Sequence, residues 1–529
     1  MNAAGPPGDT PWPSIPALAR FAGEQWGAAE AVVDGNRRVT FRELSAAATV
    51  AAKAFISLGI EPGDRVAIWA PNSYEWVVAL LGLQSAGAAL VPLNTRFRGQ
   101  EAAYILNRSR ARALVMVGGF LGVEYPRLLA AEALPHLERC VVLGTAGPPD
   151  SLSFEAFLDL GRAIADDEVA ARLQAIGTKD VSDVIFTSGT TGAPKGVVAT
   201  HGQSIRTFAE WSRIVGLTAG DRYLVVNPMF HTFGYKAGIL ACLMSGATIV
   251  PVPFFDVDVV LRTMASEHIT VLPGPPTLYQ SLLNHPDLSR TDISSLRLAV
   301  TGAAVIPVDL VRRIREDLGA ETVLTAYGLT EATGFVTSTR SSDDIETIAT
   351  TSGRAIDGVE VRVVAPDGTT VAPGTPGEVV CRGYNVMQGY FEDPEQTAEA
   401  IDAGGWLHTG DIGVLDDASN LRITDRIKDM FIVGGFNAYP AEIESLLLGH
   451  PAIAQAAVVG VPDDRLGEVG VAFVVARHGW VVDPAEVVAW ARENMANYKA
   501  PRQVLVVDAL PLNASGKVLK FELRDRLGA

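Results

Sequence analysis

The sequence predicts an α/β protein with a large N-terminal domain of parallel α/β subdomains, a barrel-like β subdomain, and a small mobile C-terminal α+β domain. Strand-like and helical segments alternate over most of the chain before Gly353, which is the pattern of βαβ units. After Gly353, short alternating strands with frequent Pro and Gly indicate the barrel-like part. A charged stretch at residues 425–429 then sets off a piece of about 100 residues. We expect domains at residues 1–425 and 431–529, joined by a hinge at 426–430.

The first elements carry turn and capping signals. A hairpin is expected at residues 32–41, turning at Asp34-Gly35. Thr40 and Glu43 form a capping-box signature, so a helix should follow and run to about residue 58. The same alternation continues with strands at 65–69, 88–91 and 114–117, and helices at 73–86 and 100–108.

Further βαβ units follow residue 200. Expected helices lie at 203–213, 236–244, 257–268 and 307–318, and expected strands at 223–227, 247–252, 270–272 and 322–326. The longest uncharged run, 237–255, is long enough to cross a membrane. Because it contains Gly246 and two prolines, we interpret it as a buried helix, a turn and a buried strand. Later expected elements are strands at 359–364, 377–382, 421–424, 430–433, 456–461, 471–476 and 503–507, and helices at 440–448 and 485–495.

Composition excludes several classes of protein. With 529 residues, 48% of them hydrophobic, the chain can bury a large core and should form more than one domain. A net charge of −17 argues against nucleic acid or an anionic membrane as a general partner. Cys140, Cys242 and Cys381 are odd in number and far apart, which is typical of reduced cytosolic thiols. The proline-rich N-terminus lacks the apolar core of a secretory signal, so we expect a cytoplasmic protein without integral membrane association.

A glycine-rich segment at residues 187–196 predicts a polyphosphate cradle. It follows a strand-like stretch at 181–186, and its composition is too polar for a core. Glycines let the backbone approach a ligand, hydroxyls and N–H groups are donors, and Lys195 adds positive charge. It is not a Walker A loop, because Pro194 stands where glycine is required and no Ser or Thr follows Lys195. A solvated turn is the alternative. The loop residues are Thr187, Ser188, Gly189, Thr190, Thr191, Gly192 and Lys195.

Four more motifs follow in a fixed order. They are Ala-Tyr-Gly-Leu-Thr-Glu at 326–331, Thr-Gly-Asp at 409–411, Asp-Arg-x-Lys at 425–428, and Gly-Lys at 516–517. Together the five motifs resemble the adenylate-forming superfamily of acyl-CoA synthetases, firefly luciferase and peptide-synthetase adenylation domains, over about residues 15–526. The resemblance implies that a small-molecule carboxylic acid reacts with Mg²⁺-ATP to give an acyl-AMP, which coenzyme A then converts to a thioester. A homodimer is left open.

The resemblance also implies roles for residues around the nucleotide. Glu331, beside Thr330, would carry Mg²⁺, although it could instead be a carboxylate at a helix N-terminus. Asp411 would accept from the ribose hydroxyls, and Arg426 would reach the ribose or phosphate unless it only pairs at the surface. The slot for adenine and acyl phosphate would be lined by Gly302, Ala303, Ala304, Ala326, Tyr327 and Gly328. The first three could also be simply a tight strand end.

Two lysines are implied in the alternation between half-reactions. Lys517 would bridge the substrate carboxylate and the α-phosphate during adenylation, although alone it reads as a surface lysine. Lys428 would be the hinge, and rotation there would withdraw Lys517 and bring Gly434 and Gly435 toward the pantetheine arm.

The acyl pocket is indicated by aromatic and small residues. His231 would gate it, or would simply be a packed histidine; it stands where amino-acid-activating domains carry an aspartate, which disfavours an α-amino acid. The other expected lining residues are Phe230, Phe233, Tyr235, Pro273, Gly274 and Thr277.

The identity of the acid rests on finer resemblance. The segments 230–242, 272–279 and 434–440 are similar to actinobacterial acyl-CoA ligases of steroid ring degradation, which implies a propanoate on a two-ring indanedione. A medium-chain, branched or aromatic acid, loading of a separate carrier protein, and a non-catalytic binding protein are the alternatives.

Overall fold

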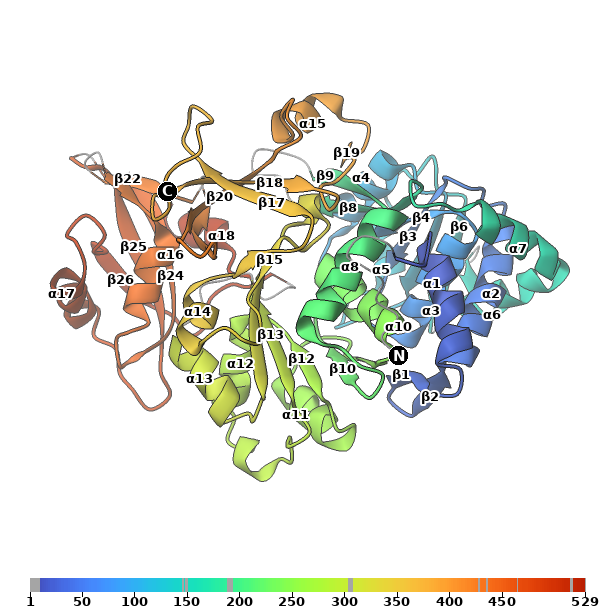
Figure 1. Ribbon diagram of the computed structural model, residues 1–529, viewed down its shortest axis with the longest axis horizontal. Coiled ribbons are helices and arrows are strands. Elements are labelled where there is room, and N and C mark those ends of the chain that lie inside the picture. Colours follow the sequence, from blue (N-terminus) through green and yellow to red (C-terminus); the bar gives the residue numbers. More distant parts are fainter. Residues whose placement is uncertain are drawn as a thin grey trace.

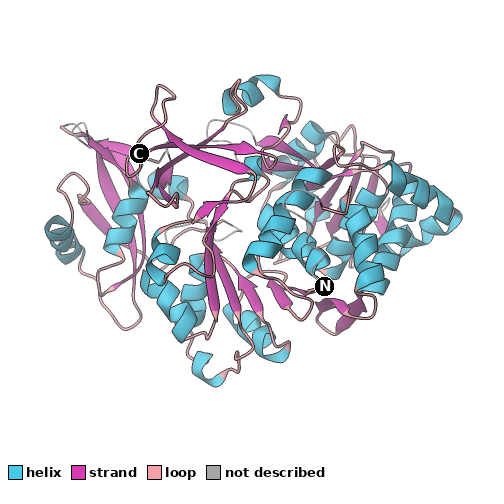
Figure 2. Cartoon of the chain, viewed as in Figure 1, coloured by secondary structure: helices cyan, strands magenta, loops and turns pink. Residues whose placement is uncertain are grey.

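The computed structural model describes residues 10–144, 147, 151–187, 194–302, 308–426, 429–433, 436–463, 465–513 and 517–528. Most of them form a large body built on three sheets, and a smaller C-terminal unit lies beside it, at the left of Figures 1 and 2. The N-terminal end of the described chain lies on the large body, among the helices that cover its first sheets.

One sheet of the large body has the order β19-β9-β8-β4-β3-β5-β6-β7. Its strands from β8 to β7 are parallel, whereas β9 and β19 run antiparallel to their neighbours. The strands are β3 (Arg65–Trp69), β4 (Ala89–Pro92), β5 (Ala113–Val117), β6 (Arg139–Leu143), β7 (Leu152–Ser153), β8 (Val181–Thr187), β9 (Lys195–Thr200) and β19 (Gly389–Tyr390).

A second sheet has the order β16-β15-β14-β13-β12-β10-β11-β1-β2. The six strands from β14 to β1 are parallel, and antiparallel strands close both edges. The strands are β1 (Glu30–Asp34), β2 (Arg37–Thr40), β10 (Arg222–Val225), β11 (Thr248–Pro251), β12 (Val271–Pro273), β13 (Leu298–Gly302), β14 (Thr322–Tyr327), β15 (Thr337–Ser338) and β16 (Arg354–Ala355).

Helices lie between and around these two sheets (Figure 2). In the large body they are α1 (Ile15–Gln25), α2 (Phe41–Ser57), α3 (Tyr74–Ser85), α4 (Gly99–Ser109), α5 (Tyr125–Leu129), α6 (Phe154–Leu160), η1 (Gly161–Ala163), α7 (Asp166–Ala175), α8 (His201–Val215), α9 (Thr232–Gly234), η2 (Tyr235–Leu240), α10 (Ala241–Ser245), α11 (Val257–Ser266), α12 (Pro276–Leu283), η3 (Leu288–Arg290), α13 (Val308–Glu316), η4 (Thr330–Ala332), α14 (Ile345–Thr350) and α15 (Pro394–Ala400). One apolar core, which includes Trp76, Phe208 and Trp211, lies between the sheets. Separate apolar clusters lie where α11, α12 and α13 cover the second sheet and where α4 and α5 cover the first.

The remaining two sheets confirm the change in pattern after Gly353. An antiparallel sheet contains β17 (Val359–Val364), β18 (Gly377–Gly383), β20 (Leu407–Leu415) and β21 (Leu421–Arg426). The C-terminal unit has its own core and contains β22 (Phe431–Val433), β23 (Phe436–Ala438), β24 (Ile453–Asp463), β25 (Gly467–Ala476) and β26 (Gln503–Val506), with α16 (Pro440–Leu447), α17 (Pro484–Asn494) and α18 (Lys520–Leu527). The predicted α/β fold class, with its barrel-like and small α+β parts, is therefore confirmed.

Most expected helices and strands begin and end within a few residues of the observed ones, because local signals mark their ends. The predicted capping box at Thr40 forms, with the Thr40 hydroxyl accepting from the Glu43 N–H and the Glu43 carboxylate accepting from the Thr40 N–H. The long uncharged run is a helix and a buried strand separated by Gly246, whose φ of 72° ends the helix. The expected helix at 236–244 begins earlier, with α9 at Thr232, and continues as a π-helix over Tyr235–Leu240.

The π-helix lies against β8 through a buried ion pair. Lys236 Nζ is 2.9 Å from Asp183 Oδ1, and each side chain is only 1% exposed. Burial lowers the pKa of Lys236, and the Asp183 charge opposes that shift. The Ser182 hydroxyl donates to Asp183 at 2.6 Å, and Gln84 donates to the Tyr235 hydroxyl at 2.9 Å. A polar network therefore joins the segment after His231 to the strand that enters the glycine-rich loop.

Candidate active site

Parallel topology gathers the predicted site at one edge. Strands β10, β12, β13 and β14 are parallel neighbours, so their carboxyl ends lie side by side. His231 follows the first of these strands, Gly274 the second, and Tyr327 ends the last. In open α/β sheets this is the edge at which ligands bind.

The start of the glycine-rich loop touches the predicted metal carboxylate. Thr187, the last residue of β8, donates its hydroxyl to Glu331 Oε1 at 3.3 Å. This contact joins the sheet that contains β8 to the segment that follows β14 of the other sheet. Glu331 lies in the short helix η4 directly after the buried Thr330. A carboxylate and a hydroxyl are oxygen ligands of the type that Mg²⁺ prefers, so these residues fit that ion.

Among the residues that the structure describes, no group of three or more His, Cys, Asp or Glu side chains could hold a metal ion. A Mg²⁺ ion here would therefore take few protein ligands and share the phosphates of a nucleotide, which is its usual coordination.

The far end of the loop carries Lys195 at the start of β9. Its ammonium contacts the Gln396 side-chain oxygen on α15, and it lies 5.1 Å from the centre of the Tyr390 ring. The Tyr390 hydroxyl in turn donates to Glu331 Oε1 at 3.2 Å. The loop lysine and the predicted metal carboxylate therefore share one aromatic neighbour, which the sequence analysis missed.

Tyr327 and Asp411, both expected to bind the nucleoside, contact each other. The Tyr327 hydroxyl donates to Asp411 Oδ2 at 2.6 Å, and Asp411 is only 3% exposed. Burial, together with the Asp411 charge, raises the pKa of Tyr327 well above its ordinary value, so the phenol stays protonated. Arg426 lies across from Asp411 in the antiparallel pair of β20 and β21. A carboxylate fixed in this way can accept from ribose hydroxyls.

Glycines at the ends of β13 and β14 allow close backbone approach. A Cβ on Gly302 would lie 2.3 Å from the Ala326 oxygen, its register partner on β14. A Cβ on Gly328 would lie 2.2 Å from the Gly334 oxygen. Both positions therefore admit only glycine, because neighbouring backbone oxygens occupy the place of a side chain.

His231 is influenced by the charge of Lys517, which belongs to the C-terminal unit. Burial, with the nearby Lys517 charge second, lowers the pKa of His231 to about 4, so the imidazole is neutral at pH 7. His231 caps α9, with its Nδ1 accepting from the Phe233 N–H at 3.4 Å.

Lys517 is exposed on a loop tied back on itself. The Lys517 N–H donates to Asn513 Oδ1 at 2.8 Å, and the Asn513 N–H donates to the Lys517 oxygen at 2.8 Å. Arg96 of the large body donates to the Leu512 oxygen at 2.8 Å. This hydrogen bond ties the segment before Lys517 to the large body.

The predicted acyl-pocket residues lie around the same edge. Phe230 and Phe233 are partly exposed beside His231, and Pro273 and Gly274 are buried at the end of β12, with Thr277 on α12. Tyr235 is fully buried with its hydroxyl held by Gln84, so it faces the core beneath the site. Trp211, which the sequence analysis missed, packs edge-on behind Phe233 at 5.9 Å between ring centres.

Several predicted site residues lie outside the described part of the chain. These are Ser188, Gly189, Thr190, Thr191, Gly192, Ala303, Ala304, Lys428, Gly434 and Gly435. Their roles stay predictions.

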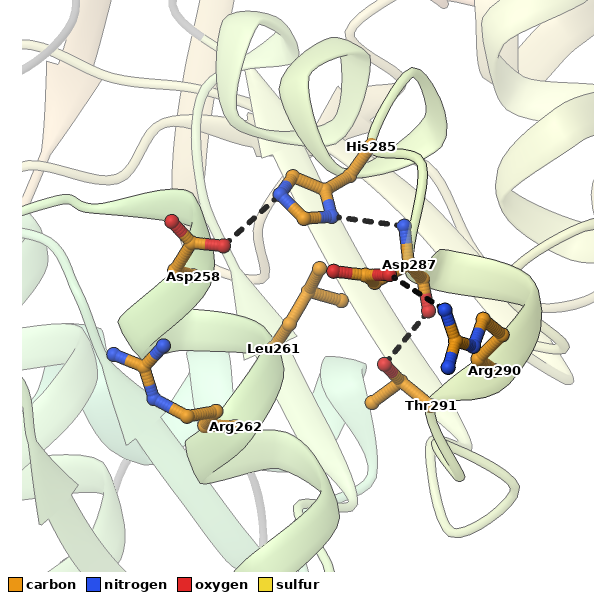
Figure 3. A pocket seen from close by; sticks show the side chains of 7 residues that line it. All are labelled: Asp258, Leu261, Arg262, His285, Asp287, Arg290 and Thr291. Atoms are coloured by element: carbon orange, nitrogen blue, oxygen red, sulfur yellow. Dashed lines mark hydrogen bonds and ion pairs between the residues drawn. The ribbon is translucent and has the colours of Figure 1, made fainter.

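A separate surface hollow of about 480 Å³ shares no residue with this site. It lies between α11 and the segment after α12 (Figure 3). His285 Nε2 lies 3.1 Å from Asp258 Oδ1, and the Asp287 N–H donates to His285 Nδ1 at 3.2 Å. His285 is thus held between two aspartates in this hollow. Within the described ranges, no helix is long and apolar enough to cross a membrane.

Comparison with known proteins adds independent findings. The family model described as AMP-binding enzyme matches residues 19–391, and the model of the AMP-binding enzyme C-terminal domain matches residues 442–517. A ligase from Rhodococcus jostii (strain RHA1), named for 3-(7a-methyl-1,5-dioxo-octahydro-inden-4-yl)propanoyl:CoA, is 50% identical over 97% of this chain and 98% of its own. A ligase of the same name from Mycobacterium tuberculosis is 54% identical over 94% of this chain and 95% of its own. The crystal structure of an anthranilate CoA ligase with anthranoyl-AMP superposes with a TM-score of 0.90, at 30% identity and 99% coverage of both chains.

Proposed function

The chain belongs to the AMP-binding enzyme family, and we propose that within this family it is an AMP-forming ligase joining an indanedione propanoate to coenzyme A. The observation that carries the proposal is the contact between the start of the glycine-rich loop and the carboxylate of Glu331. Thr187 and Glu331 meet where the loop begins, and Arg96 ties the segment before Lys517 to the large body. These contacts support one active site with a polyphosphate end and a carboxylate end.

In the first step a carboxylate oxygen of the acid attacks the α-phosphorus of ATP, and pyrophosphate leaves. Residues 187–196 would hold the departing phosphates, and the Lys517 ammonium would offset the charge of the two converging anions. Mg²⁺ carried by Glu331 would neutralise charge on the triphosphate. Asp411 and Tyr327 would fix the nucleoside, so that positioning supplies much of the rate.

In the second step the sulfur of coenzyme A attacks the acyl carbon, the bond to the phosphate oxygen breaks, and AMP leaves. The thiol proton passes to water as the thioester forms. Because AMP is already a good leaving group, this step needs no additional charged residue to stabilise it. It does need an open path for the thiol. Rotation about Lys428 would provide that path by withdrawing Lys517.

Two observations support a bulky, uncharged acyl body with polar oxygens. The neutral His231 puts no fixed charge beside Phe230 and Phe233. Both relatives with 50–54% identity are named for such a diketone propanoate.

The test is a substrate panel with purified enzyme, ATP, Mg²⁺ and coenzyme A. AMP and thioester are followed for the indanedione propanoate, octanoate, a branched acid and an aromatic acid. We expect kcat/KM for the indanedione propanoate to exceed the others by at least about tenfold, since pockets discriminate small apolar differences by about 10–200-fold. A preference for another acid would overturn the acyl assignment. AMP without thioester would favour a carrier-protein ligase, and no acid-dependent AMP at all would favour a binding protein.

Substituting Lys428 with proline is expected to spare acyl-adenylate formation and to slow thioester formation. Proline fixes φ and removes a donor, so the linker loses the rotation that the second step requires. We expect a loss of about 100-fold in that step, the scale of misplacing reacting groups. Pyrophosphate release reports the first step and thioester yield the second. Thioester formation at the unchanged rate would remove the hinge argument, and Lys428→Ala, which leaves φ free, is the control.

A further inference from the structure

Tyr390 is held firmly by its backbone. Strand β19 pairs antiparallel with β9, Tyr390 lying opposite Val197, and β9 is the strand that leaves the glycine-rich loop. The Tyr390 N–H donates to the Thr397 hydroxyl at 2.8 Å. Gly389 has a φ of 143°, and a Cβ there would lie 2.8 Å from Thr397, so the turn before the tyrosine admits only glycine.

The side chain of Tyr390 contacts two opposite charges through different parts of the ring. Its hydroxyl donates to Glu331 Oε1, and its face lies 5.1 Å from the Lys195 ammonium. A hydrogen bond to a carboxylate and a cation–π contact are both stronger than neutral contacts of the same size. One residue therefore controls the placement of the carboxylate and of the ammonium that face the polyphosphate.

We propose that Tyr390 is a positioning residue that sets Glu331 for the metal ion and Lys195 for the phosphates before the nucleotide binds. The hydroxyl restricts the carboxylate to one orientation, and the ring, together with Gln396, keeps the ammonium at the mouth of the loop. Preorganised charges lose less side-chain freedom when the ligand arrives. The inference rests on the proposed function, because that function gives Glu331 and Lys195 their ligands.

The two contacts can be separated by substitution. Tyr390→Phe removes the hydroxyl and keeps the ring, so it should weaken Mg²⁺ binding to the enzyme saturated with a non-hydrolysable ATP analogue by about tenfold, the scale of one hydrogen bond to a charged group. Binding of the analogue without Mg²⁺ should stay within about twofold of the unchanged enzyme. Tyr390→Leu removes both contacts, and should also weaken metal-free binding by about 3- to 10-fold. Titration calorimetry measures both constants directly.

Tyr384→Phe is the matched control, because the Tyr384 ring also has a cation–π contact, with Arg206 at 3.7 Å. Among the contacts that the structure describes, Tyr384 has none with Glu331 or Lys195. It should change neither binding constant. Equal Mg²⁺ affinity in Tyr390→Phe and the unchanged enzyme would overturn the inference, as would equal loss in both constants. Failure of the unchanged enzyme to bind the analogue would instead contradict the proposed function.

Discussion

Replacing Lys517 with alanine is expected to slow acyl-adenylate formation by about 100- to 1,000-fold, the range for removing one preorganised donor at a developing charge. Conversion of supplied acyl-adenylate to thioester should keep the rate of the unchanged enzyme. The reason is placement: the Lys517 loop is docked on the large body near His231, where the acid and the α-phosphate would meet. Acid-dependent exchange between pyrophosphate and ATP measures the first step, and thioester formed from synthetic acyl-adenylate measures the second.

Lys520→Met provides the control for this loss. Lys520 lies three residues further along the chain, but its ammonium pairs with Glu444 at 2.8 Å inside the C-terminal unit. Methionine keeps the apolar stem, so the C-terminal unit should still dock and adenylation should stay within a fewfold of the unchanged enzyme. Equal loss of both half-reactions in Lys517→Ala would show that the lysine acts in folding or docking and not in the first step.

The sequence predicted those elements whose signals are local. The capping box at Thr40 and the glycine after Ser245 act within a few residues, so their structures could be derived from neighbouring side chains alone. The motif order also predicted that residues far apart in the chain, such as Tyr327 and Asp411, belong to one site. Their hydrogen bond agrees with that expectation, although the ligand each would bind is a separate question.

What the sequence could not predict depends on packing between sheets. Strand β19 has two residues, too few for any periodic pattern, and it exists because β9 offers an edge for it. Tyr390 was therefore not recognisable as a neighbour of Glu331 and Lys195. The π-helix at Tyr235–Leu240 has no local signal either. One signal was present: Lys236 is a single charge at the start of a long apolar run, and such a charge requires a buried partner.

Replacing Lys236 with methionine is expected to lower the free energy of unfolding of the large body by about 3–5 kcal/mol, because it leaves Asp183 buried without its cation. Both side chains are only 1% exposed, so water cannot take the place of the lost partner. The same change should weaken the connection between β8 and the π-helix. The position of the glycine-rich loop relative to His231 should then be less well fixed. Denaturant unfolding followed by tryptophan fluorescence measures the loss, since Trp76 lies 6.1 Å from Tyr235 in the same core.

The double substitution Lys236→Met with Asp183→Leu tests whether the loss in Lys236→Met comes from leaving one buried charge without its partner. Replacing both charges removes the desolvation cost along with the attraction, so the double variant should be more stable than either single one. Lys499→Met is the matched control, because its ion pair with Glu442 is 19% and 40% exposed and should cost about 1 kcal/mol or less. If the double variant regains stability but still shows a raised KM for the acid, the ion pair also positions the acyl site. Additive losses in the cycle would contradict coupling between the two charges.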